Sequence, residues 1–160
     1  MRDIDASSIV YGWDNYPIRQ FPSVWDWINS EITDGELMMS RIAFEEVKTV
    51  SPDCAVWLKD KGISLKDVTN DIANIALDIK NALGITNDNY HPDGVGENDI
   101  FIIATSQVTS ADIISDENRQ STLPANMRKY KIPAVCNLSS VDVQCINFVE
   151  HIKQANRIFG

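Results

Sequence analysis

The sequence has few basic residues, few cysteines and no long apolar run. Its 160 residues include 14 Lys and Arg against 23 Asp and Glu, which gives a formal net charge of -9. This deficit of cations argues against broad electrostatic binding of nucleic acid, because Lys and Arg are needed to neutralise phosphates. A nucleic-acid substrate remains compatible with the charge if the acids are gathered around divalent cations.

Cysteine and histidine are both scarce. Cys54, Cys136 and Cys145 show no CxxC spacing, and His91 and His151 form no ligand pair. We therefore expect buried, reduced thiols rather than a metal site or a disulfide framework. No apolar run reaches the roughly 18 residues of a membrane span, and the N-terminal residues lack the apolar core of a signal peptide. The expected location is the cytoplasm, with no membrane partner.

Length and composition predict a single domain over residues 1–160. Hydrophobic residues make up 44% of the chain and charged residues 23%, as in folded globular proteins. Strand patterns alternate with helix patterns, which predicts an α/β fold with a mainly parallel sheet. The first strand is weak, because Arg2 and Asp3 occupy positions where a buried strand would carry Val or Ile. The expected strands cover residues 2–5, 37–39, 111–114 and 131–136, the last at a sheet edge because it contains a proline.

The helix patterns differ in regularity. Residues 68–83 repeat apolar side chains at helical spacing, and Gly84 ends the pattern. The apolar run 100–108 is compatible with a buried strand or a buried helix. We favour a helix, because Asp99 then lies in its first turn, where the helix dipole tolerates a carboxylate. Further helices are expected after Asp5, over 24–33, over 41–49, from 52 to about 61 and, capped by Ser139 or Ser140, over 141–152.

Two tryptophans, Trp25 and Trp27, lie beside the apolar stripe of one expected helix. Aromatic side chains can stack on nucleic-acid bases. Their position next to the stripe favours packing in the core or at a partner interface instead.

Acidic residues occur where several expected elements begin or end. Asp5 ends the first strand, Asp99 begins a helix, Asp116 and Glu117 follow the third strand, and Glu46 lies on a helix. The carboxyl ends of parallel strands meet at one edge of a sheet, so these acids can converge there. Three or four carboxylate oxygens, completed by water, are typical ligands of magnesium or manganese. Each position also has a simpler explanation as a helix cap, a solvated side chain or a turn former.

Six short motifs follow one another along almost the whole chain. They are residues 5–8 (Asp-Ala-Ser-Ser), 21–27 (Phe-Pro-Ser-Val-Trp-Asp-Trp), 43–47 (Ala-Phe-Glu-Glu-Val), 98–104 (Asn-Asp-Ile-Phe-Ile-Ile-Ala), 113–117 (Ile-Ile-Ser-Asp-Glu) and 131–136 (Lys-Ile-Pro-Ala-Val-Cys). In this order they resemble the PIN domain family, and within it the PIN-like toxin subfamily, a domain of unknown function related to VapC-type ribonuclease toxins. The resemblance implies a PIN-like three-layer α/β/α fold with a mainly parallel central sheet of four or five short strands flanked by helices.

The resemblance also implies a catalytic metal site holding one or two Mg²⁺ (or Mn²⁺) ions. Ser7 and Ser115 would support it by hydrogen bonding. Asn98 and Ser115 stand where commoner residues occur in the family. The implied catalytic and metal-binding residues are Asp5, Glu46, Asp99 and either Asp116 or Glu117.

Two choices among neighbouring acids remain in this assignment. Glu46 is preferred to Glu45 because it directly precedes the apolar Val47. Glu117 fits the family's offset from the preceding serine better than Asp116, but either could reach the metal.

The implied function is a magnesium-dependent endoribonuclease, the toxin of a toxin–antitoxin pair, which hydrolyses RNA phosphodiesters with a metal-activated water. Its partners would be a cognate antitoxin protein and an RNA substrate, and a homodimer is compatible with this function. The alternative is a catalytically inactive PIN-like protein that acts through protein–protein contacts, with Trp25, Trp27 and Trp57 at an interface, and the negative charge favours it. A receiver-type phosphotransfer module is disfavoured, because no well-placed Lys follows the late strand.

Overall fold

The computed structural model describes all residues, 1–160, and places five short strands at the centre of the chain. These strands are β1 (Arg2–Ile4), β2 (Leu37–Ser40), β3 (Ser64–Lys66), β4 (Asp112–Ile114) and β5 (Cys145–Ile146). They form one sheet in the order β3-β2-β1-β4-β5, and every neighbouring pair is parallel. Parallel neighbours require crossover connections, which the helices supply.

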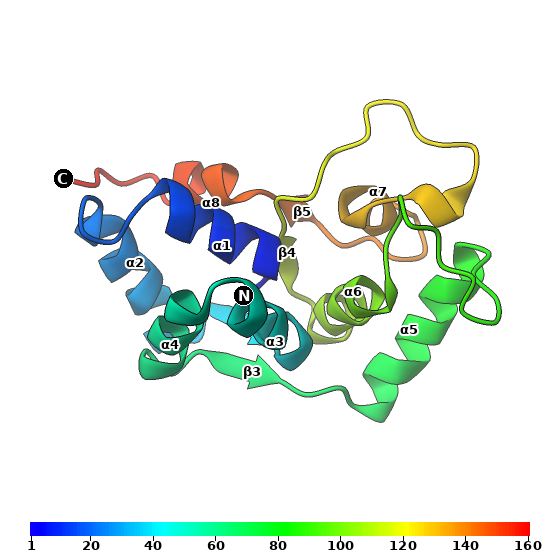
Figure 1. Cartoon of the computed structure of the whole chain (residues 1–160), viewed down its shortest axis with the longest axis horizontal. Helices are drawn as coiled ribbons and strands as arrows, with labels where there is room; N and C mark the ends of the chain where they lie inside the picture. The colour runs from blue at the N-terminus through cyan, green and yellow to red at the C-terminus, as the bar shows by residue number, and fades with distance from the viewer.

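Eight α-helices flank the sheet. They are α1 (Ala6–Asn15), α2 (Pro22–Thr33), α3 (Arg41–Val50), α4 (Pro52–Asp60), α5 (Asn70–Ala82), α6 (Glu97–Thr109), α7 (Ile132–Cys136) and α8 (Phe148–Gln154). Figure 1 shows α1, α2 and α8 on one side of β4 and β5, and α5, α6 and α7 on the other. The central strand contacts both layers, since Arg2 donates to His151 of α8 and Asp3 accepts from Ser106 of α6. The predicted three-layer α/β/α fold is confirmed.

The strand order places a topological switch point between β1 and β4. From β1 the chain proceeds to β2 and β3, and it then crosses back to add β4 and β5 on the other side. The backbone N–H of Asp5 donates to the carbonyl of Ile114 at 2.9 Å, so β1 and β4 end side by side. In open α/β sheets the ligand crevice lies beyond the carboxyl ends of the strands at such a point.

Helices α5 and α6 confirm two sequence predictions. The side chain of Thr69 caps α5 by accepting from the N–H of Ile72 at 3.3 Å. The ambiguous apolar run belongs to α6, as favoured from the position of Asp99. Ile100, Ile102 and Ile103 are all buried, because α6 is covered on several sides. This burial explains why the run shows no clear helical periodicity.

Two predicted elements near the C-terminus are wrong. Residues 131–136 are not an edge strand: they form helix α7, with Pro133 in its first turn, where the missing N–H costs nothing. The last helix does not begin near Val141. It is preceded by β5, and α8 is capped by Asn147, which accepts from the N–H of Glu150 at 2.8 Å.

Two further differences concern the strands. The polar strand β3 has no counterpart among the predictions, since it is an edge strand with little buried surface. The weak first strand is the centre of the sheet, and Asp3 within it is fully buried. None of the eight helices combines the length and the apolar character that crossing a bilayer requires.

The buried tryptophans and thiols agree with most of the sequence analysis. Trp25 and Trp27 are buried, so core packing is confirmed and their expected use at a partner interface is wrong. Trp57 is half-buried and packs edge-to-face on Trp25, with ring centroids 5.1 Å apart. No cysteine forms a disulfide, and Cys54 and Cys136 are buried.

Candidate functional site

Asp5 is the innermost acid at the carboxyl edge of the sheet. It occupies the N-cap position of α1, but its side chain does not cap the helix. Its Oδ2 instead accepts hydrogen bonds from Ser7 Oγ at 2.7 Å and from Ser115 Oγ at 3.2 Å. Burial raises the pKa of Asp5, the Ser7 hydroxyl opposes this, and the charge of Asp99 raises the pKa further. The two serines expected to support the site therefore do orient one of its acids.

Glu46 of α3 and Asp99 of α6 both lie close to Asp5. In addition to burial, the charge of Asp99 raises the pKa of Asp5, and the charge of Asp5 raises the pKa of Glu46. Asn98 Nδ2 donates to Glu46 Oε1 at 3.2 Å, which joins the two helices beside the site. Burial raises the pKa of Glu46, and the charges of Asp5 and then Asp99 add to the effect. Glu45, in contrast, is exposed and pairs with Lys48, in agreement with the choice of Glu46.

Asp99 combines a helix cap with a position facing the other acids. Its Oδ2 accepts a hydrogen bond from the N–H of Gly96 at 2.9 Å, which closes the first turn of α6. Burial raises the pKa of Asp99, while the Gly96 N–H and the charge of Lys131 lower it. The cap explanation is thus correct for one oxygen, and the second oxygen accepts no hydrogen bond.

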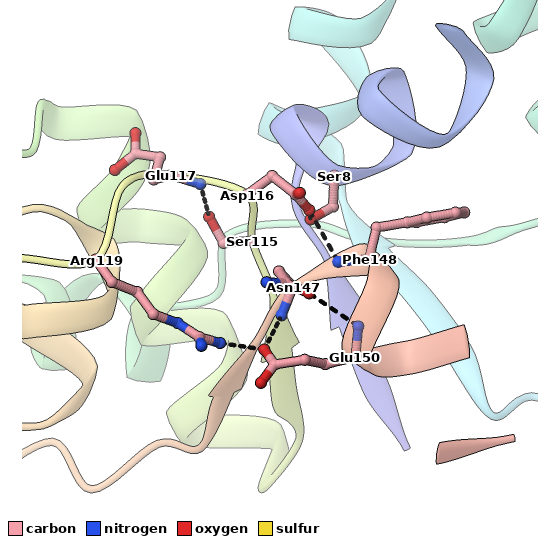
Figure 2. A network of polar contacts seen from close by, with 8 residues as sticks. All are labelled: Ser8, Ser115, Asp116, Glu117, Arg119, Asn147, Phe148 and Glu150. Carbon is pink, nitrogen blue, oxygen red and sulfur yellow. Dashed lines mark hydrogen bonds and ion pairs between the residues drawn. The ribbon is translucent and has the colours of Figure 1, made fainter. Parts of the chain in front are cut away.

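Asp116 and Glu117 are consecutive, but Figure 2 shows that their carboxylates point in different directions. Asp116 Oδ1 accepts from Ser8 Oγ and from the N–H of Phe148, the latter at 2.9 Å. Asp116 thereby ties α1 to the start of α8. The structure places this candidate catalytic residue in a structural network rather than among the other acids.

Glu117 is the member of this pair that joins the acids. Its Oε2 accepts a hydrogen bond from the N–H of Ile132 at 3.1 Å. Burial raises the pKa of Glu117 to about 7, and the charges of Asp99 and Asp5 contribute to the shift. Asp5, Glu46, Asp99 and Glu117 therefore form one electrostatically coupled group, which we call the acidic cluster.

Lys131 is a site residue that the sequence analysis missed. Its charge lowers the pKa of both Asp99 and Glu117, so it lies beside the acidic cluster. Lys131 lies in the last of the six motifs, to which the sequence analysis gives no role in the site. The reason is that residues 131–136 are expected there to form an edge strand. As a helix, the segment turns back toward the acids, and Lys131 stands at its N-cap.

Residues 3–159 match the model of a family described as a domain of unknown function (DUF4411). The chain belongs to this family. The matched range of this DUF4411 chain includes the whole acidic cluster and Lys131. No curated protein matches the chain.

The donor set of this DUF4411 chain fits a hard divalent cation. In Glu46, Asp99 and Glu117 one carboxylate oxygen is held by a hydrogen bond and the other accepts none. Carboxylate oxygens are the ligands that Mg²⁺ and Mn²⁺ prefer. As the side chains stand, no three His, Cys, Asp or Glu residues are gathered closely enough to hold an ion. Mutual repulsion between carboxylates without a counter-charge favours such separation.

Replacing Asp116 by Ala is expected to weaken the fold and to leave the acidic cluster intact. The Ser8 hydroxyl and the Phe148 N–H would lose their acceptor, at a cost of about 1–3 kcal/mol. For a chain of this size the melting temperature should fall by roughly 5 °C, as measured by circular dichroism. The exposed Asp26 on α2 offers a control, since Asp26→Ala removes the same charge and no hydrogen bond. An Asp116→Ala protein with unchanged melting but lost chemistry would contradict the structural role.

Proposed function

We propose that the chain is a magnesium-dependent endoribonuclease of the PIN-like type, the toxin of a toxin–antitoxin pair. The observation that supports this most is the convergence of Asp5, Glu46, Asp99 and Glu117 from separate elements beside the β1–β4 switch point. Burial raises the pKa of all four. Asp5 is buried and the other three are half-buried. Carboxylates that are partly removed from water and repel one another destabilise a fold, and a single lysine is too little charge to offset four of them. Perturbed acids collected at such an edge are typical of a functional site.

In the proposed mechanism the acidic cluster would hold one or two Mg²⁺ or Mn²⁺ ions. When bound, the ion supplies positive charge against the phosphodiester and lowers the pKa of an attacking water. Ser7 and Ser115 keep Asp5 Oδ2 directed by their hydroxyls. Glu117, with a pKa of about 7 in the absence of an ion, holds a proton below neutral pH and would have to be ionised to serve as a ligand.

The proposal is tested by the metal requirement of cleavage. Protein freed of any bound antitoxin is incubated with labelled single-stranded RNA in Mg²⁺, in Mn²⁺ and in chelator. We expect internal cleavage in either metal and none in chelator. Absence of cleavage in both metals would overturn the ribonuclease proposal, and cleavage that persists in chelator would overturn its metal dependence.

The second candidate is a PIN-like protein without catalysis that acts through protein contact. The net charge of -9 favours it, because an acidic surface suits a basic partner better than RNA. Since Trp25 and Trp27 are buried, such an interface would have to use other side chains. Thermal melting separates the candidates: a cation that binds the folded acidic cluster raises the melting temperature, whereas an inactive cluster that binds no ion gives no shift.

A further inference from the structure

One segment of this acidic chain carries basic residues and no acidic ones. Residues 118–141 form its longest stretch without Asp or Glu. The stretch carries four of the 14 basic residues, namely Arg119, Arg128, Lys129 and Lys131. We call it the acid-free segment. The segment itself therefore carries a charge of +4, which favours a polyanion locally.

The acid-free segment begins and returns at the acidic cluster. Its first part, residues 118–131, follows Glu117 directly and is the long loop between β4 and α7, drawn in yellow in Figure 1. The Glu117 carboxylate accepts from the N–H of Ile132, which follows the loop, so both ends of the loop meet at this acid. A strand bound along the loop would consequently pass the acidic cluster.

Hydrogen bonds hold the backbone at the two lysines of the segment. Gln120 donates through Nε2 to the carbonyl of Lys129 at 3.0 Å and accepts through Oε1 from the N–H of Lys131 at 2.9 Å. Between them, Tyr130 has an extended backbone and a buried side chain. Lys129, the last residue of a short 3-10 helix, and Lys131, the N-cap of α7, flank Tyr130 and are both half-buried, so each side chain is partly open to solvent.

A close backbone contact holds residues 128–130 of the acid-free segment against residues 89–95, which precede α6. The N–H of Val95 donates to the carbonyl of Tyr130 at 2.9 Å, and Arg128 Nη1 donates to the carbonyl of Asn89 at 2.8 Å. At Gly94 a Cβ atom would lie 1.8 Å from the carbonyl oxygen of Arg128, so only glycine allows this approach. The lysines are presented on a braced backbone, which lowers the entropy that binding would cost.

The cations of the segment are largely without partners. No carboxylate lies within 4.0 Å of Arg128, Lys129 or Lys131, whereas Arg119 pairs with Glu150. Lys131 is half-buried beside Asp99 and Glu117 and still forms no direct ion pair with either. Its ammonium group remains available to an anion at the edge of the acidic cluster.

A cavity of about 560 Å³ adjoins the same segment. Its lining is mixed and includes the apolar side chains of Tyr130 and Val143 and the amides of Asn137 and Gln144. Leu123 stands at the cavity and is 55% exposed. A planar group with hydrogen-bonding edges, such as a nucleobase turned out of a single strand, matches this mixed lining.

We propose that the acid-free segment holds the RNA strand, with its phosphates on Lys129 and Lys131 and an unstacked base in the adjoining cavity. This inference rests on the proposed function and names the substrate-binding surface of that site. Lys131 contacts the phosphate closest to the acidic cluster. It is a substrate-binding residue and not a metal ligand.

The test measures binding apart from cleavage. In an Asp99→Asn background, in which cleavage is expected to be slow, and in chelator, the affinity for a labelled single-stranded RNA is measured by fluorescence anisotropy over a series of salt concentrations. Lys129→Gln with Lys131→Gln should weaken binding at least about fivefold at 0.1 M salt and lower the salt slope by about 1.4, or about 0.7 per phosphate contact. Ala134→Phe, which fills the cavity, should weaken binding and leave the salt slope unchanged.

The matched control is Lys59→Gln with Lys61→Gln on and beside α4, which removes the same charge far from the loop. The inference is overturned if both double variants lose the same affinity for RNA, or if Lys129→Gln with Lys131→Gln loses none. An unchanged affinity in Ala134→Phe overturns the base-binding part of it. These outcomes are separate from failure of the proposed function, which appears as absent cleavage by the wild-type chain in Mg²⁺.

Discussion

Asp99→Asn is expected to lower the rate of Mg²⁺-dependent RNA cleavage at least about a hundredfold. Loss of a residue that only orients a metal ligand typically costs about 10–100-fold, and loss of the ligand itself should cost more. The asparagine keeps an oxygen that can accept from the Gly96 N–H, so the cap of α6 is retained. It loses the negative charge that a hard divalent cation requires. Initial rates at saturating Mg²⁺ measure the effect, and melting temperatures in chelator verify the fold.

The control for this experiment lies in the same helical turn. Glu97 is exposed and makes no contact with the acidic cluster, so Glu97→Gln removes one charge from the same turn and should leave the rate within about twofold. Equal rates for wild type and Asp99→Asn would show that Asp99 does not take part in catalysis. An equal loss of rate in both variants would mean that the effect comes from removing any negative charge in this turn.

In metal-free buffer the folded protein is expected to lose stability as the pH rises from about 5 to about 7. The pKa values of Asp3 and Glu117 are raised by burial to about 7, from ordinary values of 3.8 and 4.5. Within this window the folded state keeps protons that the unfolded state has released, so the free energy of unfolding falls as protons are withdrawn. For a fully buried group such as Asp3 the slope approaches about 1.4 kcal/mol per pH unit, and the less buried Glu117 adds less.

Urea unfolding at pH 5, 6, 7 and 8 in chelator measures this dependence. Asp3→Asn should flatten part of it, since the amide oxygen can still accept from Ser106 and no buried charge forms. Asp3 Oδ1 has no hydrogen-bond partner, which makes the ionised form costly. Mg²⁺ at pH 8 should restore stability by offsetting the charge of the acidic cluster. Stability that is constant or rises between pH 5 and pH 7 would contradict the raised pKa values.

The sequence predicted best where a local pattern was long or chemically strong. The stripe in residues 68–83 is long enough for a 3.6-residue period to emerge, and it became α5. The error at residues 131–136 has the opposite cause. Five apolar residues, one of them a proline, are as compatible with an edge strand as with the first turn of a helix. The hydrogen bond from Ile132 to Glu117, which is distant in sequence, belongs to the helical outcome.

By itself, the sequence determined the α/β class, the supply of acids at element ends, the preference for Glu46 and the absence of acids from residues 118–141. These are properties of composition and local order. Only the tertiary structure showed that Glu117, and not Asp116, lies beside the other acids. Consecutive side chains leave the chain in different directions, and the start of α8 takes one of them through the Phe148 N–H. The tertiary structure also places Lys131 beside the acids. The path of a loop depends on its long-range contacts, which its own residues do not reveal.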